Sequence, residues 1–105
     1  MDYAHTSAAA RARHRKAQTL ARWCYARGIL GGLSDQPPAL QRVIARQAGV
    51  RPPHHSDCRS ETWQLVDELL AARVVWDRVH GMIPPSGVAD VAAAVDSAAP
   101  SSAHV

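Results

Sequence analysis

Two adjacent histidines and a cysteine, His54, His55 and Cys58, come closest in this chain to the residue types and spacing of a metal site. Zinc sites take histidine and cysteine ligands a few residues apart and then need a second pair farther along the chain. Only Cys24 is left as a fourth ligand, and the helical pattern places it on an apolar helix face, where a free cysteine is usually a small buried hydrophobe. We therefore predict no metal site and no cofactor.

Residues for nucleophilic or acid–base catalysis form no better set. Cys58 and His54 lack a sequence pattern that would place an orienting group and oxyanion donors beside them. Asp67 and Glu68 are adjacent, so on a helix their side chains point about 100° apart and do not form a carboxylate pair. The glycines of residues 28–32 are not followed by the Lys-Ser/Thr of a phosphate-binding loop. The sequence thus predicts a protein that is not an enzyme and has no small-molecule substrate.

Basic side chains are concentrated in the first half of the chain. Residues 1–51 hold nine of the twelve basic side chains and two acidic ones, a net charge of +7, whereas residues 52–105 carry −4. Eleven of the twelve are arginines, whose planar guanidinium groups favour bidentate contacts to phosphate or carboxylate. These arginines bind a polyanion such as DNA, pair with the acidic second half, or form a solvated helix face. The candidate nucleic-acid-binding residues are Arg11, Arg13, Arg15, Lys16, Arg22, Arg42, Arg46 and Arg51.

Three segments carry strong helical patterns: residues 7–28, 38–48 and 60–80. Their signals are strong helix formers in the first, a proline at the start of the second, and Ser60 as the N-cap of the third. A weaker pattern over residues 87–97 predicts a fourth helix, and the composition after it predicts a disordered C-terminal tail. The sequence thus predicts an all-α fold, a small bundle of three main helices with a weak fourth.

Length and composition favour a single domain with two weaker ends. We divide the chain into a basic N-terminal helical extension (1–16), a helical domain (17–80) and a Pro/Ala/Ser-rich tail (81–105). No secretory signal and no run of the roughly 18 apolar residues that a membrane span needs is present, and two cysteines are too few for a disulfide framework. We expect a cytoplasmic protein that does not bind a membrane.

Residues 44–50, IARQAGV, resemble the first helix and turn of the helix-turn-helix of many bacterial regulators. In that motif a small residue such as Ala45 allows close helix approach, and a glycine such as Gly49 permits the tight turn. The resemblance implies a DNA-reading helix that begins within about three or four residues of the turn. Here two prolines and the histidine pair follow instead, and the next strong helical pattern starts at residue 60.

The third predicted helix is apolar on two sides, with one stripe from Leu65 to Val79 and another from Trp63 to Val74. Such a helix lies between two neighbours or is shared with another chain. The first stripe consists of Leu65, Leu69, Ala72, Trp76 and Val79. The residues that we assign to a partner interface are Trp23, Trp63, Leu70 and Val74.

Two hypotheses of function follow. The first is a small nucleic-acid-associated protein, DNA-binding or a regulatory accessory, whose arginine-rich first helix contacts phosphates. The second is a protein–protein interaction or oligomerisation module that docks a partner protein, or a second copy as a homodimer, through the apolar surface of the third helix. Binding that weakens steeply with salt would distinguish the first from the second.

Overall fold

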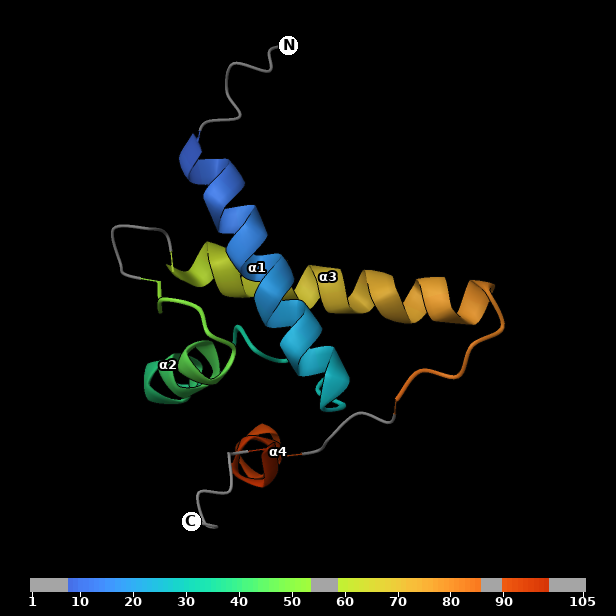
Figure 1. Cartoon of the computed structure of the whole chain (residues 1–105). Coiled ribbons are helices and arrows are strands. Elements are labelled where there is room, and N and C mark those ends of the chain that lie inside the picture. Colours follow the sequence, from blue (N-terminus) through green and yellow to red (C-terminus); the bar gives the residue numbers. More distant parts are fainter. Residues whose placement is uncertain (1–7, 54–58, 86–89, 99–105) are drawn as a thin grey trace.

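The computed structural model describes residues 8–53, 59–85 and 90–98, and every regular element within these ranges is a helix. The helices are α1 (Ala8–Ala26), α2 (Pro38–Gln47), α3 (Arg59–Val79) and α4 (Val91–Ala98), as Figure 1 shows. The predicted all-α bundle of three main helices and a shorter fourth is confirmed. The first three helices end within two residues of their predicted bounds. Residues 87–89 of the predicted fourth helix, and the predicted tail beyond α4, lie outside the described residues.

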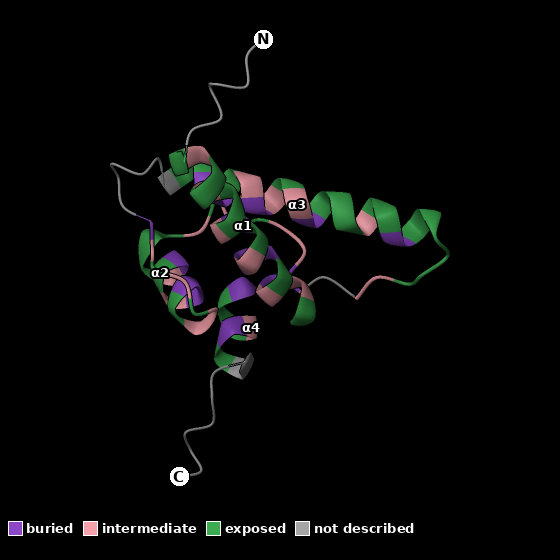
Figure 2. Cartoon of the chain, turned by 45° about the horizontal axis from the view of Figure 1, so that its top comes forward, coloured by how far each residue is buried: buried purple, intermediate pink, exposed green. Residues whose placement is uncertain are grey.

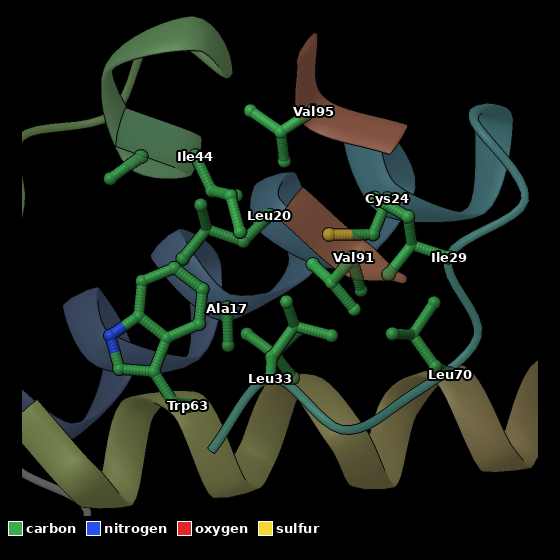
Figure 3. Close-up of a cluster of buried hydrophobic side chains, with 13 residues drawn as sticks. Ala17, Leu20, Cys24, Ile29, Leu33, Ile44, Trp63, Leu70, Val91 and Val95 are labelled. Atoms are coloured by element: carbon green, nitrogen blue, oxygen red, sulfur yellow. The ribbon is translucent and has the colours of Figure 1, made fainter. Parts of the chain in front are cut away.

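The core forms where α1 crosses α3 (Figure 1). One face of α1 and one stripe of α3 point into it, and the segment after α1, together with α2 and α4, closes it, as Figure 3 shows. Burying one Leu, Ile or Val side chain contributes about 1.5–3 kcal/mol, so these contacts dominate the stability of so small a domain. The buried apolar residues are Ala17, Leu20, Ala21, Cys24, Ile29, Leu33, Ile44, Ala45, Trp63, Val66, Leu70, Val91 and Val95.

The first three helices end in the same way, with a glycine in the left-handed region and a hydrogen bond back into the last turn. At the end of α2, Gly49 has a φ of 78°, and the N–H of Val50 donates to the carbonyl oxygen of Ala45 at 2.8 Å. A side chain is strained at this φ, so the motif requires glycine there. The apolar residue after the glycine is Ile29 for α1, 1% exposed, and Met82 for α3, 46% exposed. The motif therefore returns the chain to the core after α1 but leaves it in solvent after α3.

The connection between α1 and α2, residues 29–37, is fixed by side chains of α2 and α3. The Asp67 carboxylate accepts hydrogen bonds from the backbone N–H groups of Leu33 (2.8 Å) and Ser34 (3.1 Å) and from the Ser34 hydroxyl (2.8 Å). Gln41, which is buried, donates from Nε2 to the carbonyl oxygen of Leu33 at 2.7 Å. These bonds satisfy backbone groups that an irregular buried segment would otherwise leave unpaired.

The segment after α2 does not form the second half of a helix-turn-helix. Residues 50–53 are not helical, and α3 begins only at Arg59, so no helix starts within four residues of Gly49. The prolines at 52 and 53 explain part of this difference, because a proline keeps the residue before it out of the helical region. The resemblance of residues 44–50 therefore covers a helix and its C-terminal turn but not a recognition helix.

α4 packs on the core with two valines. Asp90 precedes the helix, and its Oδ1 accepts hydrogen bonds from the N–H groups of Ala92 (3.0 Å) and Ala93 (3.4 Å) as an N-cap does. Val91 and Val95, four residues apart on one face, are 8% and 2% exposed. Among the helices within the described ranges, none is long and apolar enough to cross a membrane.

The C-terminal half of α3 extends beyond the body of the protein, as Figures 1 and 2 show. Beyond Leu70, the only α3 residue that is buried is Asp77. Figure 2 shows this part of the helix mostly in the colour of exposed residues, in contrast to the half that α1 crosses. α3 therefore has two functions in the fold: its first half supports the core, and its second half presents side chains to solvent.

Candidate interaction surface

Large apolar side chains gather at the exposed end of α3. We call the group Val75, Trp76, Val79, Met82 and Ile83 the α3 tip. Trp76 is 49% exposed, Val79 75% and Ile83 94%. Single exposed apolar residues are normal on protein surfaces, but five large ones within nine residues of chain mark a candidate interaction site.

A groove of about 410 Å³ lies between α1 and α3. Its lining is largely apolar and includes one arginine from each helix, Arg22 of α1 and Arg73 of α3. The Arg22 guanidinium also donates to the Thr19 hydroxyl oxygen at 3.4 Å. A second hollow, lined by Leu69, Ala72, Arg73 and Trp76, shares two residues with the groove and connects it to the α3 tip. No acidic side chain lines either hollow among the described residues. The groove is lined by Gln18, Ala21, Arg22, Tyr25, Leu69, Leu70 and Arg73.

A polar cluster of three side chains fixes α1 to the exposed half of α3 at one end of this groove. The Tyr25 hydroxyl donates a hydrogen bond to Oδ2 of Asp77, and Nε of Arg73 donates to Oδ1 of the same carboxylate at 3.0 Å. These donors, the tyrosine first, hold the pKa of Asp77 below its usual range. The same hydrogen bond, together with burial, raises the pKa of Tyr25. The carboxylate thus stays charged, with one donor on each oxygen, although Asp77 is 0% exposed.

Aromatic rings hold the exposed side chains beside the cluster in defined positions. The guanidinium carbon of Arg73 lies 4.5 Å from the ring centroid of Tyr25 and 5.7 Å from that of Trp76, both within the range of a cation–π contact. The Trp76 ring stacks on His80, with 3.9 Å between the ring centroids. Arg73 and Trp76 are therefore positioned by neighbours before any partner arrives, which reduces the entropy that binding would cost.

The predicted nucleic-acid-binding residues divide among several places. Arg11 and Arg15 are exposed and line one shallow hollow on α1, whereas Arg22 lies in the groove beside Arg73. Arg13 is 3.7 Å from the carboxylate of Glu61, the arrangement of an ion pair within the chain. Lys16 is half-buried, and the exposed arginines of the α2 region are Arg42, Arg46 and Arg51.

The structure places two of the four predicted partner-interface residues in the core. Trp63 and Leu70 are 0% and 1% exposed and belong to the core, because α1 and the segment after it pack on their stripe of α3. Val74 is half-buried. Trp23 is also half-buried against the core, and the guanidinium carbon of Arg27 lies 4.0 Å from the centroid of its ring. The exposed apolar surface lies instead on the opposite stripe, at Ala72, Trp76 and Val79.

The cluster of Tyr25, Arg73 and Asp77 was not found from the sequence. Arg73 and Asp77 are four residues apart on one helix, a spacing that allows an ion pair, and this was a usable signal. Nothing in the sequence links Tyr25 to Asp77, because 52 residues separate them and only the crossing of α1 over α3 brings them together.

Cysteine and histidine chemistry has little support among the described residues. Cys24 is buried, and desolvation raises its pKa from 9.0 to about 12, which keeps the thiol protonated and unreactive near neutral pH. Within the described ranges no three His, Cys, Asp or Glu side chains are close enough together to hold a metal ion. His54, His55 and Cys58 lie outside the residues that the structure describes.

The surface is therefore defined by the α3 tip and by the groove beside it, with α1 and α3 each supplying one arginine to the groove. Comparisons of the chain with protein-family models, with curated proteins and with solved structures found no match.

Proposed function

We propose that this chain is a protein-interaction module that binds a partner through the α3 tip and the adjoining groove. The observation that carries the proposal is the exposure of Trp76, Val79 and Ile83 on a helix end that the body of the protein does not cover. Removing this apolar surface from water would stabilise a complex by roughly 25 cal/mol per Å² before the costs of association. Tryptophan and arginine, both present here, are also the residues that most often dominate binding energy at interfaces.

The proposal is tested with a variant that places charge on the tip and leaves the core unchanged. Trp76→Asp/Val79→Asp changes two exposed side chains, and Ala39→Asp/Ala92→Asp adds the same charge at exposed positions of α2 and α4. We expect the wild-type and control chains, but not the tip variant, to co-purify a stoichiometric protein that re-forms the complex from purified components. All three chains should give the same circular dichroism spectrum.

Two other results of this experiment are informative. A wild-type mass of two chains by light scattering, reduced to one chain in the tip variant, would support the interaction surface with a second copy as its partner. Complexes that form equally well with the tip variant and with the control would refute the proposal, because the tip would then contribute nothing to binding.

Nucleic-acid association is the second candidate function, and the exposed arginines of α1 favour it. Arg11 and Arg15 lie one helical turn apart and share one hollow, an arrangement that can follow a phosphate backbone. If each contacts a phosphate, binding of a mixed-sequence duplex weakens strongly between about 50 and 200 mM salt. Arg11→Ala/Arg15→Ala should then reduce the salt slope by about two, one for each lost contact.

The control for this experiment is Arg42→Ala/Arg46→Ala, which removes the same charge from the exposed side of α2. A greater loss of binding in the α1 variant would support phosphate contacts on α1. If the wild type and both variants bind the duplex equally weakly, the arginines of α1 form only a solvated helix face.

A further inference from the structure

The residues that line the groove between α1 and α3 indicate what kind of partner it would bind. It lies between two helices, and its floor is apolar at Ala21 and Leu69. Exposed apolar residues continue from it along α3 through Ala72 and Trp76. An apolar groove on a helical surface can receive the apolar face of an amphipathic helix.

The charges beside the groove are of one sign. Arg22 of α1 lines the groove, and so does Arg73 of α3, whose side chain is 48% exposed. The nearest carboxylate in the cluster, that of Asp77, is buried and already accepts hydrogen bonds from Tyr25 and Arg73. The residues that line the groove therefore include two arginines and no acidic side chain.

We infer that the groove receives an acidic amphipathic helix of a partner protein, whose apolar side chains cover Leu69 and Ala72 and whose carboxylates pair with Arg22 and Arg73. The inference rests on the proposed function. Guanidinium groups bind carboxylates in bidentate geometry, and Arg73 is already oriented by Asp77 and by the Tyr25 ring, so little of its side-chain entropy is lost on binding.

Two other occupants fit the groove less well, a second copy because of its charge and a nucleic acid because of the apolar floor. A second copy that met this groove through a two-fold axis would bring the two arginines against the same two arginines, and like charges across an interface oppose association. A nucleic acid would pair with the guanidinium groups but would leave the apolar floor and Trp76 without a partner.

The test uses three helical peptides of about 18 residues with the same leucine stripe and with glutamate, glutamine or lysine on both flanks. Each labelled peptide is titrated into the full-length chain and followed by fluorescence anisotropy. We expect the glutamate peptide to bind about tenfold more tightly than the glutamine peptide, as two exposed ion pairs can provide, and the lysine peptide not to bind. Amide chemical-shift changes should concentrate at Ala21, Leu69 and Ala72.

A charge reversal locates the site. Arg22→Glu should weaken the glutamate peptide and allow the lysine peptide to bind, because it reverses the charge on one side of the groove. Arg42→Glu, at an exposed position of α2, should bind all three peptides as the wild type does. Arg73 is unsuitable for this purpose because it also holds Asp77.

Three results would overturn the inference. Equal affinity for the glutamate and glutamine peptides would remove the acidic character of the partner while leaving the interaction surface intact. Equal binding of the glutamate peptide to Arg22→Glu and Arg42→Glu would place the site elsewhere. Failure of all three peptides to bind at millimolar concentration would exclude a helix in the groove. The proposed function would not fall with it, because Trp76→Asp/Val79→Asp tests that function separately.

Discussion

Both halves of α3 carry apolar residues at helical spacing, but their surroundings differ. In the first half, Trp63, Val66 and Leu70 are at most 1% exposed, and α1 crosses the helix there. In the second half, the position that continues the buried stripe is Asp77, a carboxylate held by two donors. The outward stripe remains apolar in both halves and ends at Val79, which is 75% exposed. The comparison shows that the apolar residues of the second half are not accounted for by the core of this chain.

The two tryptophans of α3 differ in burial in the same way as the two halves of the helix. Trp63 is 0% exposed and lies at one side of the buried cluster in Figure 3, whereas Trp76 is 49% exposed, stacks on His80 and lies near the Arg73 guanidinium. The same residue type therefore stabilises the fold at one position and is available to a partner at the other.

The largest effect is expected for Trp63→Ala. Replacing a fully buried tryptophan leaves a cavity and removes most of its packing contacts, which costs about 3–5 kcal/mol in the free energy of unfolding. Urea denaturation followed by circular dichroism measures this loss. A loss below about 1 kcal/mol would contradict the placement of Trp63 in the core. The first half of α3 would then be no better packed than the second.

A smaller loss is expected for Asp67→Ala, which tests how the first half of α3 holds the segment between α1 and α2. The change leaves the N–H of Leu33 without its acceptor, at a cost of about 1–3 kcal/mol. Glu68→Ala, at the exposed neighbouring position, should change the free energy of unfolding by less than about 0.5 kcal/mol. Equal effects of the two substitutions would show that the Asp67 hydrogen bonds do not stabilise the fold.

The pH dependence of stability tests the Asp77 cluster in the second half. The pKa of Asp77 is lowered from its ordinary value of 3.8, so its contribution is present above that pH and is lost as the pH falls through the folded pKa. Asp77→Asn should therefore be less stable than the wild type at neutral pH, and the difference should shrink under acid conditions. Urea denaturation at a series of pH values measures it, and a difference independent of pH would contradict a charged Asp77.

The free energy of unfolding at alkaline pH tests the Tyr25 hydrogen bond of the same cluster. The pKa of Tyr25 is raised above 10.0, so its contribution is complete below that pH and is lost as the pH rises through the folded pKa. Tyr25→Phe should remove this alkaline loss and leave the rest of the curve in place. A wild-type curve that does not fall above pH 10 would show that Tyr25 does not donate to Asp77.

The smallest effect on stability is expected for Trp76→Ala, which sharpens the contrast with Trp63. The side chain is half exposed, and its stacking and cation–π contacts are solvated, so the free energy of unfolding should fall by less than about 1 kcal/mol. Partner binding should nevertheless weaken in the same variant. A loss as large as that of Trp63→Ala would mean that the tip is part of the core.

The sequence was sufficient for the helices and insufficient for the site. Helix ends follow from local signals: prolines at the start of α2, and glycines after α1, α2 and α3 in the left-handed region. The site depends on which side of α3 is covered, and both sides are apolar at helical spacing, so the choice of Trp63 and Leu70 as interface residues had no local signal against it. Tyr25 and Asp77, far apart in the chain, offered none either.

By itself the sequence determined an all-α chain with three main helices, a basic first half and an apolar face on α1, because helix propensity, caps and periodicity act within a few residues. The tertiary structure decided which stripe of α3 joins the core, where Asp67 and Asp77 find their donors, and which apolar residues remain in solvent. Those outcomes depend on the crossing of α1 over α3, which joins residues that local sequence signals do not connect.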